Sequence, residues 1–408
     1  MAAMVADPLD ASAGVPYDTL SALRDECPVS KTAAGVYFLA RHDDVLAATR
    51  NIDVFQASFR AVGVIVPPEE QLISEIPEPR HGKIRRIINS AIAQHRITRV
   101  EPFVRQLCHE LLDKIVARGG GDLVADFVTP IPATVIAHLL GVDPADHARF
   151  AEWSDVVVQS AYATKNRREQ GADGEGLAGV APGFAAYLDA MIAERRRSAA
   201  PPDDFVTRLI NTNLDGEYLT DLEMRTQLAF LLMSGNETTR HLIANMLETV
   251  CTDAALFARL RYERNLVPIV VEESLRHDSP IHVLLRDCLR DITIEGVAIA
   301  AGTKVGFGLA SANRDRRTYN DPDEFRLDRP NTKDHLAFGG GPHICPGASL
   351  ARLEGRVALD VFLDRVGQAD VDDGYRREPV PVFWANGPRK LPVTLTGSDP
   401  NSPPSFCQ

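Results

Sequence analysis

The spacing of apolar residues along the chain predicts a mostly helical protein. In residues 100–118 the apolar side chains fall at 100, 103, 104, 107, 111, 112 and 115, the three-and-four spacing of a helix that buries one face. Alternating patterns are short and few. Residues 35–40 predict one strand, and residues 292–294 and 297–299 predict a hairpin that turns at Glu295-Gly296. The pattern therefore predicts a large helical body with a small β-rich region.

Residues 228–247 continue a helical apolar pattern, but its middle is interrupted. The interruption consists of six polar or very small residues, Ser234-Gly235-Asn236-Glu237-Thr238-Thr239. Glycine costs about 1 kcal/mol relative to alanine inside a helix, and threonine hydroxyls compete for backbone carbonyls. A local cost inside an apolar helix indicates function. The alternative is that Glu237 and Thr238 only satisfy a buried polar kink.

Length and composition predict one domain over residues 1–408, with flexible tails at about 1–14 and 396–408, because no linker-like segment divides the chain. The net charge of −12 argues against a nucleic-acid binder, which needs a basic face. Asp7 and Asp10 interrupt the short N-terminal apolar stretch, so we expect a cytoplasmic protein without a membrane anchor. The six cysteines are scattered along the chain without a C-x-x-C pair, so we expect no disulfide framework.

One cysteine stands in a glycine-rich loop just before a helical pattern, in the run Phe338-Gly339-Gly340-Gly341-Pro342-His343-Ile344-Cys345-Pro346-Gly347. Glycines let a backbone approach a flat ligand, and amides near a helix start can donate to a sulfur anion. A metal site made only of protein side chains would need several Cys or His residues at short spacing. A single thiolate on such a loop suits haem iron.

This loop resembles the haem-binding signature of the cytochrome P-450 family, F-x-x-G-x-[HR]-x-C-x-G, and every fixed position matches. Three other landmarks occur in the family's order: residues 77–86 resemble its helix C, residues 234–239 its long central helix, and residues 273–276 its E-x-x-R motif. The resemblance spans about residues 15–395. It implies the cytochrome P-450 fold, a mainly α, prism-like helical body with a small β-rich region.

The resemblance also implies the cofactor, haem b, with Cys345 as the ligand of the iron. Phe338, Gly339, His343 and Gly347 of the same loop would lie against the haem. Burying the two haem propionates without cationic partners would be costly. Four residues fit that need by motif position, the alternative for each being an ordinary surface charge: His81, Arg85, Arg286 and His343.

In the family, the interrupted helix passes over the haem face opposite the thiolate. By resemblance, Gly235 opens a groove for dioxygen, Thr238 hydrogen-bonds the bound oxygen, and Glu237 relays protons from solvent. Ser234 departs from the family's usual alanine. It could assist proton delivery or bond its own helix.

The pair Glu273 and Arg276, three apart on a helix, would have a structural role by the same resemblance. In the family a later arginine joins the pair and fixes the core beneath the cysteine loop. Arg329 is the preferred candidate for that arginine, and Arg326 is the competing one.

Pro346 directly follows the cysteine and lacks an amide hydrogen. One hypothesis is that the missing donor leaves the Cys345 sulfur more electron-rich and makes reduction of the iron harder. The alternative is that Pro346 simply occupies the first position of the next helix, where proline is tolerated.

Family-like positions predict a mostly apolar substrate pocket, and thus a hydrophobic substrate such as a steroid, terpenoid, fatty acyl or polyketide compound. His282 and Asn386 could each bond one polar group of the substrate, although an exposed loop position is the more ordinary interpretation. The predicted pocket residues are Ile65, Leu231, Ser234, Ile281, His282, Val283, Phe383 and Trp384.

The leading function is a monooxygenase that uses O2 to oxidise such a molecule. The haem domain fills the chain, and its G-x-G-x-x-G match at residues 174–179 lies between two helical patterns instead of after a strand, so it is not a nicotinamide or flavin site. Electrons would therefore come from a separate ferredoxin and ferredoxin reductase. The positive face for that contact would be Lys83, Arg86, Arg352 and Arg356, and the protein is expected to be a monomer. Two alternatives remain: a peroxide-driven or non-oxygenase haem-thiolate enzyme, and a non-catalytic haem or ligand-binding module.

Overall fold

A computed structural model describes residues 7–10, 12–58, 66–92, 94–162, 176–213 and 216–398. The predicted pocket residue Ile65 and parts of both predicted tails lie outside these residues. The helices are α1 (Tyr17–Glu26), α2 (His42–Arg50), α3 (Arg80–Ala91), α4 (Gln94–Ala117), α5 (Pro130–Leu140), α6 (His147–Tyr162), α7 (Gly176–Val180), α8 (Pro182–Arg197), α9 (Phe205–Asn211), α10 (Asp221–Thr252), α11 (Ala254–Tyr262), α12 (Val267–His277), α13 (Leu309–Ala312) and α14 (Ala348–Arg365).

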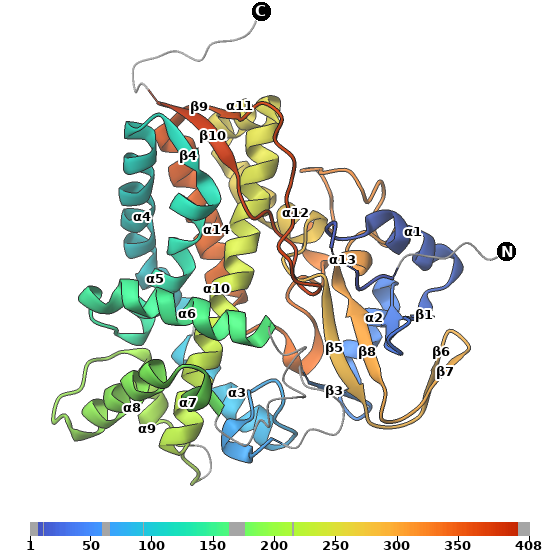
Figure 1. Cartoon of the computed structure of the whole chain (residues 1–408), viewed down its shortest axis with the longest axis vertical. Coiled ribbons are helices and arrows are strands. Elements are labelled where there is room, and N and C mark those ends of the chain that lie inside the picture. Colours follow the sequence, from blue (N-terminus) through green and yellow to red (C-terminus); the bar gives the residue numbers. More distant parts are fainter. Residues whose placement is uncertain are drawn as a thin grey trace, which may run out of the picture.

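The axis of the fold is α10, an uninterrupted helix of 32 residues. A capping box fixes its start: the Thr220 hydroxyl accepts from the Glu223 amide, and the Glu223 carboxylate accepts from the Thr220 amide. Figure 1 shows α10 running through the molecule, with α6, α8 and α9 around its first half and α12 and α14 beside its second half.

The two halves of α10 belong to different hydrophobic clusters. Leu228 and Leu232 pack into a cluster with buried residues of α3, α5, α6 and α8. Leu242, Met246 and Val250 pack into a second cluster with α4, α12 and α14. The six polar and small residues at 234–239 lie between these two clusters. An apolar stretch on either side therefore anchors a helix whose middle presents polar groups.

The five-stranded sheet and the β6–β7 hairpin lie on the side of α1 and α2, whereas the three-stranded sheet lies at one end of the helical body, beside α4 (Figure 1). The five-stranded sheet has the order β1-β2-β8-β5-β3, and the three-stranded sheet has the order β4-β10-β9. The strands are β1 (Val29–Lys31), β2 (Tyr37–Leu39), β3 (Phe55–Ala57), β4 (Gly120–Asp122), β5 (Val283–Cys288), β6 (Ile292–Ile294), β7 (Val297–Ile299), β8 (Lys304–Gly308), β9 (Val366–Val371) and β10 (Pro392–Gly397).

The elements predicted from periodicity are confirmed. Helix α4 begins six residues before the predicted segment, at Gln94, and ends one residue before its end, at Ala117. Strands β6 and β7 pair in the expected register, Ile292 with Ile299, and their turn places Glu295 and Gly296 at φ 48° and 77°. Positive φ at both central positions is typical of a tight hairpin turn. Within the described part of the chain, no helix is both long and apolar enough to span a membrane.

Glu354 of α14 gives the helical core a measurable pH dependence. The residue is 1% exposed, one carboxylate oxygen has no partner among the described residues, and burial raises its pKa from the ordinary 4.5 to about 8. Between these pH values the unfolded chain has released a proton that the folded protein retains. Stability therefore falls as pH rises from about 4.5 to 8.

We predict that Glu354→Gln removes this loss. The wild type should lose on the order of 3 kcal/mol of unfolding free energy between pH 5 and pH 8, and the variant should not lose it, since one pKa unit corresponds to about 1.4 kcal/mol. Urea unfolding of both proteins at pH 5 and pH 8 measures these free energies. Glu152→Gln, at an exposed position of α6, is the matched control. Equal pH dependence in Glu354→Gln and wild type would contradict the prediction.

Candidate active site and cofactor pocket

The loop that carries Cys345 is shaped by its glycines and by α2. The Cys345 amide donates to the Phe338 carbonyl over 2.9 Å, which closes the loop on itself. Gly341 has φ 61°, and a Cβ there would come within 2.4 Å of the Thr49 carbonyl oxygen. Glycine at this position therefore allows both the left-handed backbone and the close approach to α2.

The Cys345 thiol is accessible, yet burial raises its pKa. This combination describes a group that lines a hollow within the protein rather than a convex surface. The backbone amides of Gly347 and Ala348 and the cations Arg85 and Arg352 act in the opposite direction and favour the thiolate. Two amides at the start of α14 thus face the sulfur, as the sequence indicated.

The four predicted cationic residues come together from three elements. The rings of His81 (α3) and His343 (cysteine loop) lie 4.2 Å apart between centroids. The Arg85 guanidinium donates to the carbonyl of Ile344, next to Cys345. Burial, followed by the charges of His81, Arg286 and Arg85, lowers the pKa of His343 to about 4. These residues therefore form one cluster, here called the cationic cluster.

The cationic cluster is short of anionic partners. His81 is 2% exposed, and its Nε2 atom has no hydrogen-bond partner among the described residues. Arg286 is 8% exposed, it donates a hydrogen bond to the neighbouring Leu285 carbonyl, and burial lowers its pKa to about 10. Buried donors without acceptors are costly. A ligand carrying two carboxylates, such as a haem with its propionates, fits this cluster beside Cys345.

The predicted catalytic residues on α10 lie close together, but each already has a partner. The Thr238 hydroxyl donates to the Ser234 carbonyl over 2.7 Å. The Glu237 carboxylate is 3% exposed, lies 2.6 Å from the Arg240 guanidinium, and lies 3.1 Å from Nε2 of His241. A hydroxyl that donates its hydrogen can only accept from a further partner. Thr238 is therefore placed as an acceptor in this conformation.

Gly235 has a packing reason to be glycine that the sequence did not reveal. A Cβ at this position would come within 2.7 Å of Cδ1 of Ile136, on α5. The missing side chain lets α10 approach α5, and the groove for dioxygen at Gly235 stays a prediction. Ser234, one residue earlier, has its hydroxyl 3.4 Å from the Leu231 carbonyl, within its own helix.

The E-x-x-R pair has the geometry expected of it. Arg276 and Glu273 are fully buried and joined by two hydrogen bonds of 2.7 and 2.8 Å. Arg329 adds its Nε to the same carboxylate over 2.9 Å. Arg326 contributes only its backbone amide, while its side chain reaches Asp321 and Asp328. Arg329 is thus the third charged member.

The predicted pocket residues divide into two groups. Leu231 and Ser234 are half-buried and lie on the same face of α10 as Thr238, and Ile281 is half-buried beside the five-stranded sheet. Val283, Phe383 and Trp384 instead belong to the hydrophobic cluster beneath α1. This cluster gives those three residues a packing role that spacing along the chain could not reveal.

The exposed-loop interpretation of His282 and Asn386 is wrong. His282 is 0% exposed, and its Nε2 lies 2.7 Å from the Pro8 carbonyl. Asn386 is 6% exposed and accepts a hydrogen bond from Arg377 over 3.0 Å. His282 therefore has one ring nitrogen turned to the N-terminal segment instead of to a substrate.

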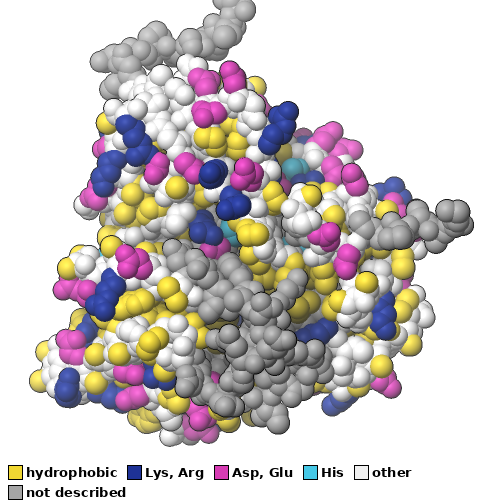
Figure 2. Space-filling view, viewed as in Figure 1, with side chains coloured by type: hydrophobic (Ala, Val, Ile, Leu, Met, Phe, Trp, Pro, Cys, Tyr) yellow, Lys and Arg dark blue, Asp and Glu magenta, His cyan; other side chains and the backbone are white. Residues whose placement is uncertain are grey.

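The expected positive face is largely neutralised. Arg352 makes two hydrogen bonds to Glu272, Arg356 donates to Glu101 over 2.6 Å, and Lys83 lies 3.4 Å from Glu217. On the face shown in Figure 2, acidic and basic side chains are interspersed, and hydrophobic side chains gather between them.

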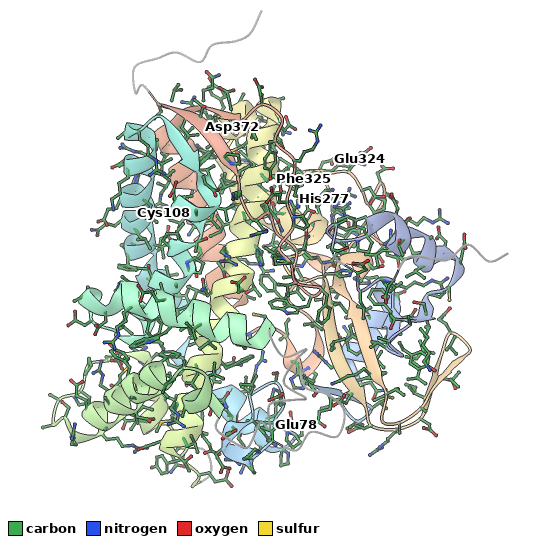
Figure 3. All side chains as sticks on the ribbon, in the orientation of Figure 1. Glu78, Cys108, His277, Glu324, Phe325 and Asp372 are labelled. Carbon is green, nitrogen blue, oxygen red and sulfur yellow. The ribbon has the colours of Figure 1, made fainter. Side chains whose placement is uncertain are left out.

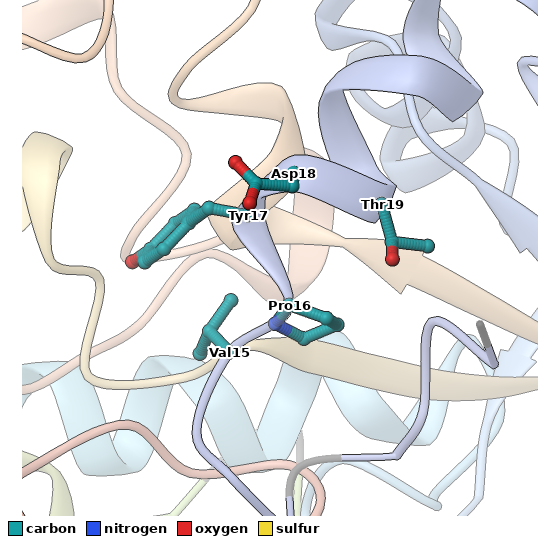
Figure 4. Close-up of a pocket in the computed structure, with 5 residues that line it drawn as sticks. All are labelled: Val15, Pro16, Tyr17, Asp18 and Thr19. Carbon is teal, nitrogen blue, oxygen red and sulfur yellow. The ribbon is translucent and has the colours of Figure 1, made fainter. Parts of the chain in front are cut away.

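A cavity of about 330 Å³ lies beside the first turn of α1 and is separate from this site. Figure 4 shows its described lining, Val15, Pro16, Tyr17, Asp18 and Thr19. The Tyr17 hydroxyl lies 3.3 Å from Asp278. None of these lining residues is among the predicted site residues.

Comparison with known proteins identifies the family. Residues 59–366 match the sequence profile described as Cytochrome P450. The erythromycin C-12 hydroxylase of Saccharopolyspora erythraea is 35% identical over 94% of this chain and 95% of its own length. The steroid C26-monooxygenase of Mycolicibacterium smegmatis is 31% identical over 93% of this chain and 92% of its own length.

Solved structures agree with that match. Cytochrome P450 CYP109Q5 from Chondromyces apiculatus has a TM-score of 0.84 at 33% identity, covering 94% of this chain and 96% of that chain. CYP109E1 from Bacillus megaterium, in complex with testosterone, has a TM-score of 0.82 at 30% identity, covering 93% and 99%. The chain belongs to the cytochrome P450 family. It has the P450 fold and is a monooxygenase, an oxidoreductase, and the family implies a haem-iron cofactor.

Three residues of the site were missed in the sequence. Glu78 contacts His81, and Arg240 and His241 contact Glu237. Their spacing of three or four residues on a helix, or just before one, was the available signal, since such positions are neighbours on a helix surface.

Pro346 does not occupy the first position of α14, and its electronic role stays a prediction. Helix α14 begins at Ala348, so Pro346 lies two residues before it and not at its first position. The amides of Gly347 and Ala348 already face the sulfur, and Pro346 contributes none.

We predict that Pro346→Leu raises the reduction potential of the haem iron. The leucine amide would add a donor to the sulfur. One hydrogen bond to a charged acceptor is worth about 1.5 kcal/mol, or about 60 mV for one electron. A spectroelectrochemical titration of both proteins measures the change, with Pro342→Leu in the same loop as control. An unchanged potential would remove the hypothesis.

Proposed function

We propose that this P450 oxidises a hydrophobic, multi-ring or macrocyclic small molecule, using O2 and electrons from a separate ferredoxin and its reductase. The cofactor would be haem b. The observation that carries the proposal is that Glu237 and Thr238 lie on α10, which packs against α14, and that Cys345 lies in the loop three residues before α14. A non-catalytic haem module would not need a buried acid and alcohol side by side.

When bound to Cys345, the haem would supply the iron at which dioxygen is activated. The chain's own task is then to deliver protons. Thr238, which donates to the Ser234 carbonyl, would accept a hydrogen bond from a water or another proton-bearing group and hold it in the site.

Glu237 would carry protons between solvent and Thr238. Its partner Arg240 is 20% exposed at the side chain, while Glu237 itself is almost fully buried. Turning the carboxylate from Arg240 toward Thr238 would move a proton inward without opening the site to bulk water. The ion pair with Arg240 defines the outward position of that movement.

The substrate class is supported by the apolar character of the half-buried residues and by the relatives. Leu231 and Ile281 would offer hydrophobic contacts, with Ser234 as one hydroxyl among them. The two curated relatives are named for erythromycin and for steroids, and one solved relative holds testosterone. A bulky, mostly apolar substrate is common to all three.

We predict that Thr238→Ala uncouples electron use from product formation. Loss of the acceptor hydroxyl should lower product yield per electron at least about 10-fold and release peroxide, because positioned proton donors and acceptors contribute about 10²–10⁴-fold. The measurement is product and peroxide per reductant consumed. Thr249→Ala is the matched control, since Thr249 makes the same bond to a carbonyl four residues earlier on α10. Unchanged coupling in Thr238→Ala would argue for a peroxide-driven enzyme or a haem module.

A second prediction concerns the substrate. Optical titration of the ferric protein with steroids, macrolides, fatty acids and small aromatic acids should shift the haem absorption band for a steroid or macrolide. Fatty and aromatic acids should leave it in place, because Leu231 and Ile281 are half-buried apolar residues and offer no charge to a carboxylate. A shift with the acids alone would overturn the proposed substrate class.

A further inference from the structure

His81 of the cationic cluster is held from behind by a carboxylate. Its Nδ1 atom lies 2.8 Å from Oε1 of Glu78, which stands two residues before α3. The other carboxylate oxygen of Glu78 accepts the Gly82 amide over 3.1 Å. Figure 3 labels Glu78 beside the start of this helix. Glu78 therefore has one oxygen on the imidazole and one on the backbone of α3.

Gly82 makes room for this arrangement. A Cβ at position 82 would lie 3.0 Å from Oε2 of Glu78, closer than ordinary contact. The backbone of Gly82 is not left-handed, so its conformation does not require glycine. The space that the Glu78 carboxylate occupies is the structural reason for glycine at this position.

The contact with Glu78 determines which edge of the His81 ring faces the pocket. A carboxylate is an acceptor, so the hydrogen of a neutral His81 lies on Nδ1, and a charged ring also donates there. Nε2 is then on the opposite edge, buried and without a partner among the described residues. The hydrogen bond from His81 lowers the pKa of Glu78, so Glu78 is ionised at neutral pH.

The same contact places one negative charge behind a cluster that contains two arginines. Arg85, Arg286 and His343 surround the site that His81 faces. Glu78 is a carboxylate hydrogen-bonded to a member of this cluster. An imidazole held by a carboxylate on one nitrogen and free on the other is the arrangement that orients histidine toward a bound group.

We propose that Glu78 is a positioning residue for haem retention: through Nδ1 it fixes the ring of His81 so that Nε2 meets a haem propionate. This deepens the proposed function, because it rests on haem binding beside Cys345. It assigns to Glu78 a role in holding the cofactor and no role in the chemistry at the iron.

A purely structural role is the competing explanation. Through Gly82, Glu78 also satisfies one of the free amides at the start of α3. Glu78→Gln separates the two roles, because the neutral amide keeps an oxygen for the Gly82 amide but loses the charge beside His81. The hydrogen bond that caps α3 should survive this change, whereas the charged partner that orients His81 should be lost.

The experiment measures the rate at which the purified haem-loaded protein transfers haem to excess apomyoglobin. Glu78→Gln should lose haem about 10-fold faster than wild type, the lower end of the range for residues that orient a ligand. His81→Gln should show a loss at least as fast. Glu217→Gln is the control, since it removes one carboxylate that pairs with Lys83 of the same helix outside the cluster.

The double variant decides between the two explanations. If Glu78 acts through His81, adding Glu78→Gln to His81→Gln leaves the rate unchanged. If Glu78 only caps α3, Glu78→Gln speeds haem loss by the same factor in the wild type and in the His81→Gln variant. That result, or a wild-type rate in Glu78→Gln, overturns the proposal.

Two further measurements complete the test. Glu78→Asp keeps the charge on a shorter arm and should give an intermediate rate, so the proposal can still be judged if Glu78→Gln fails to fold. Haem content of the wild type after purification is measured separately. A wild type without haem would remove the proposed function itself, whereas wild-type retention in Glu78→Gln would remove only the role of Glu78.

Discussion

Two neighbouring carboxylates on α12 anchor the chain around the loop that carries Cys345: Glu272 binds a residue on each side of the loop, and Glu273 binds the segment that precedes it. Glu273, fully buried, joins Arg276 and Arg329, and Arg276 also donates to three backbone carbonyls of residues 313–324. Glu272 binds His335, just before the loop, and Arg352, just after it. Although burial acts to raise its pKa, these hydrogen bonds lower the pKa of Glu272 to about 2. Removing one partner from such a buried set costs about 3–5 kcal/mol.

This anchoring matters because the loop itself has little regular structure. Its shape is set by glycines, by the contact with α2 and by one backbone hydrogen bond from Cys345 to Phe338. A thiolate needs a fixed position relative to the cations and amides that stabilise it. The ion networks of α12 provide that fixed position, and α14 then extends from the loop into the main hydrophobic cluster.

The opposite wall of the site uses a different principle. Helix α10 is anchored by apolar residues at both ends, so its middle tolerates a fully buried glutamate, an asparagine and two threonines. Three of these side chains have partners: Asn236 donates to Ser154 of α6, Thr238 donates to the Ser234 carbonyl, and Glu237 lies against Arg240 and His241. A rigid ionic base under the thiolate therefore faces a helix whose polar groups can exchange partners, which suits proton delivery in a P450.

The sequence by itself determined the helical body, the hairpin with its register, the cysteine loop and the family, because these depend on local periodicity, turn residues and short motifs. It also indicated Arg329 before Arg326, and the four cations of the cofactor pocket. Only the tertiary structure decided that Gly235 makes room for Ile136 of α5 and that His282, Val283, Phe383 and Trp384 pack toward the N-terminal segment. It alone showed that Glu272, Glu101 and Glu217 neutralise the expected positive face. These contacts join residues about 80 to 270 positions apart or on different helices, and spacing along one element carries no information about such partners.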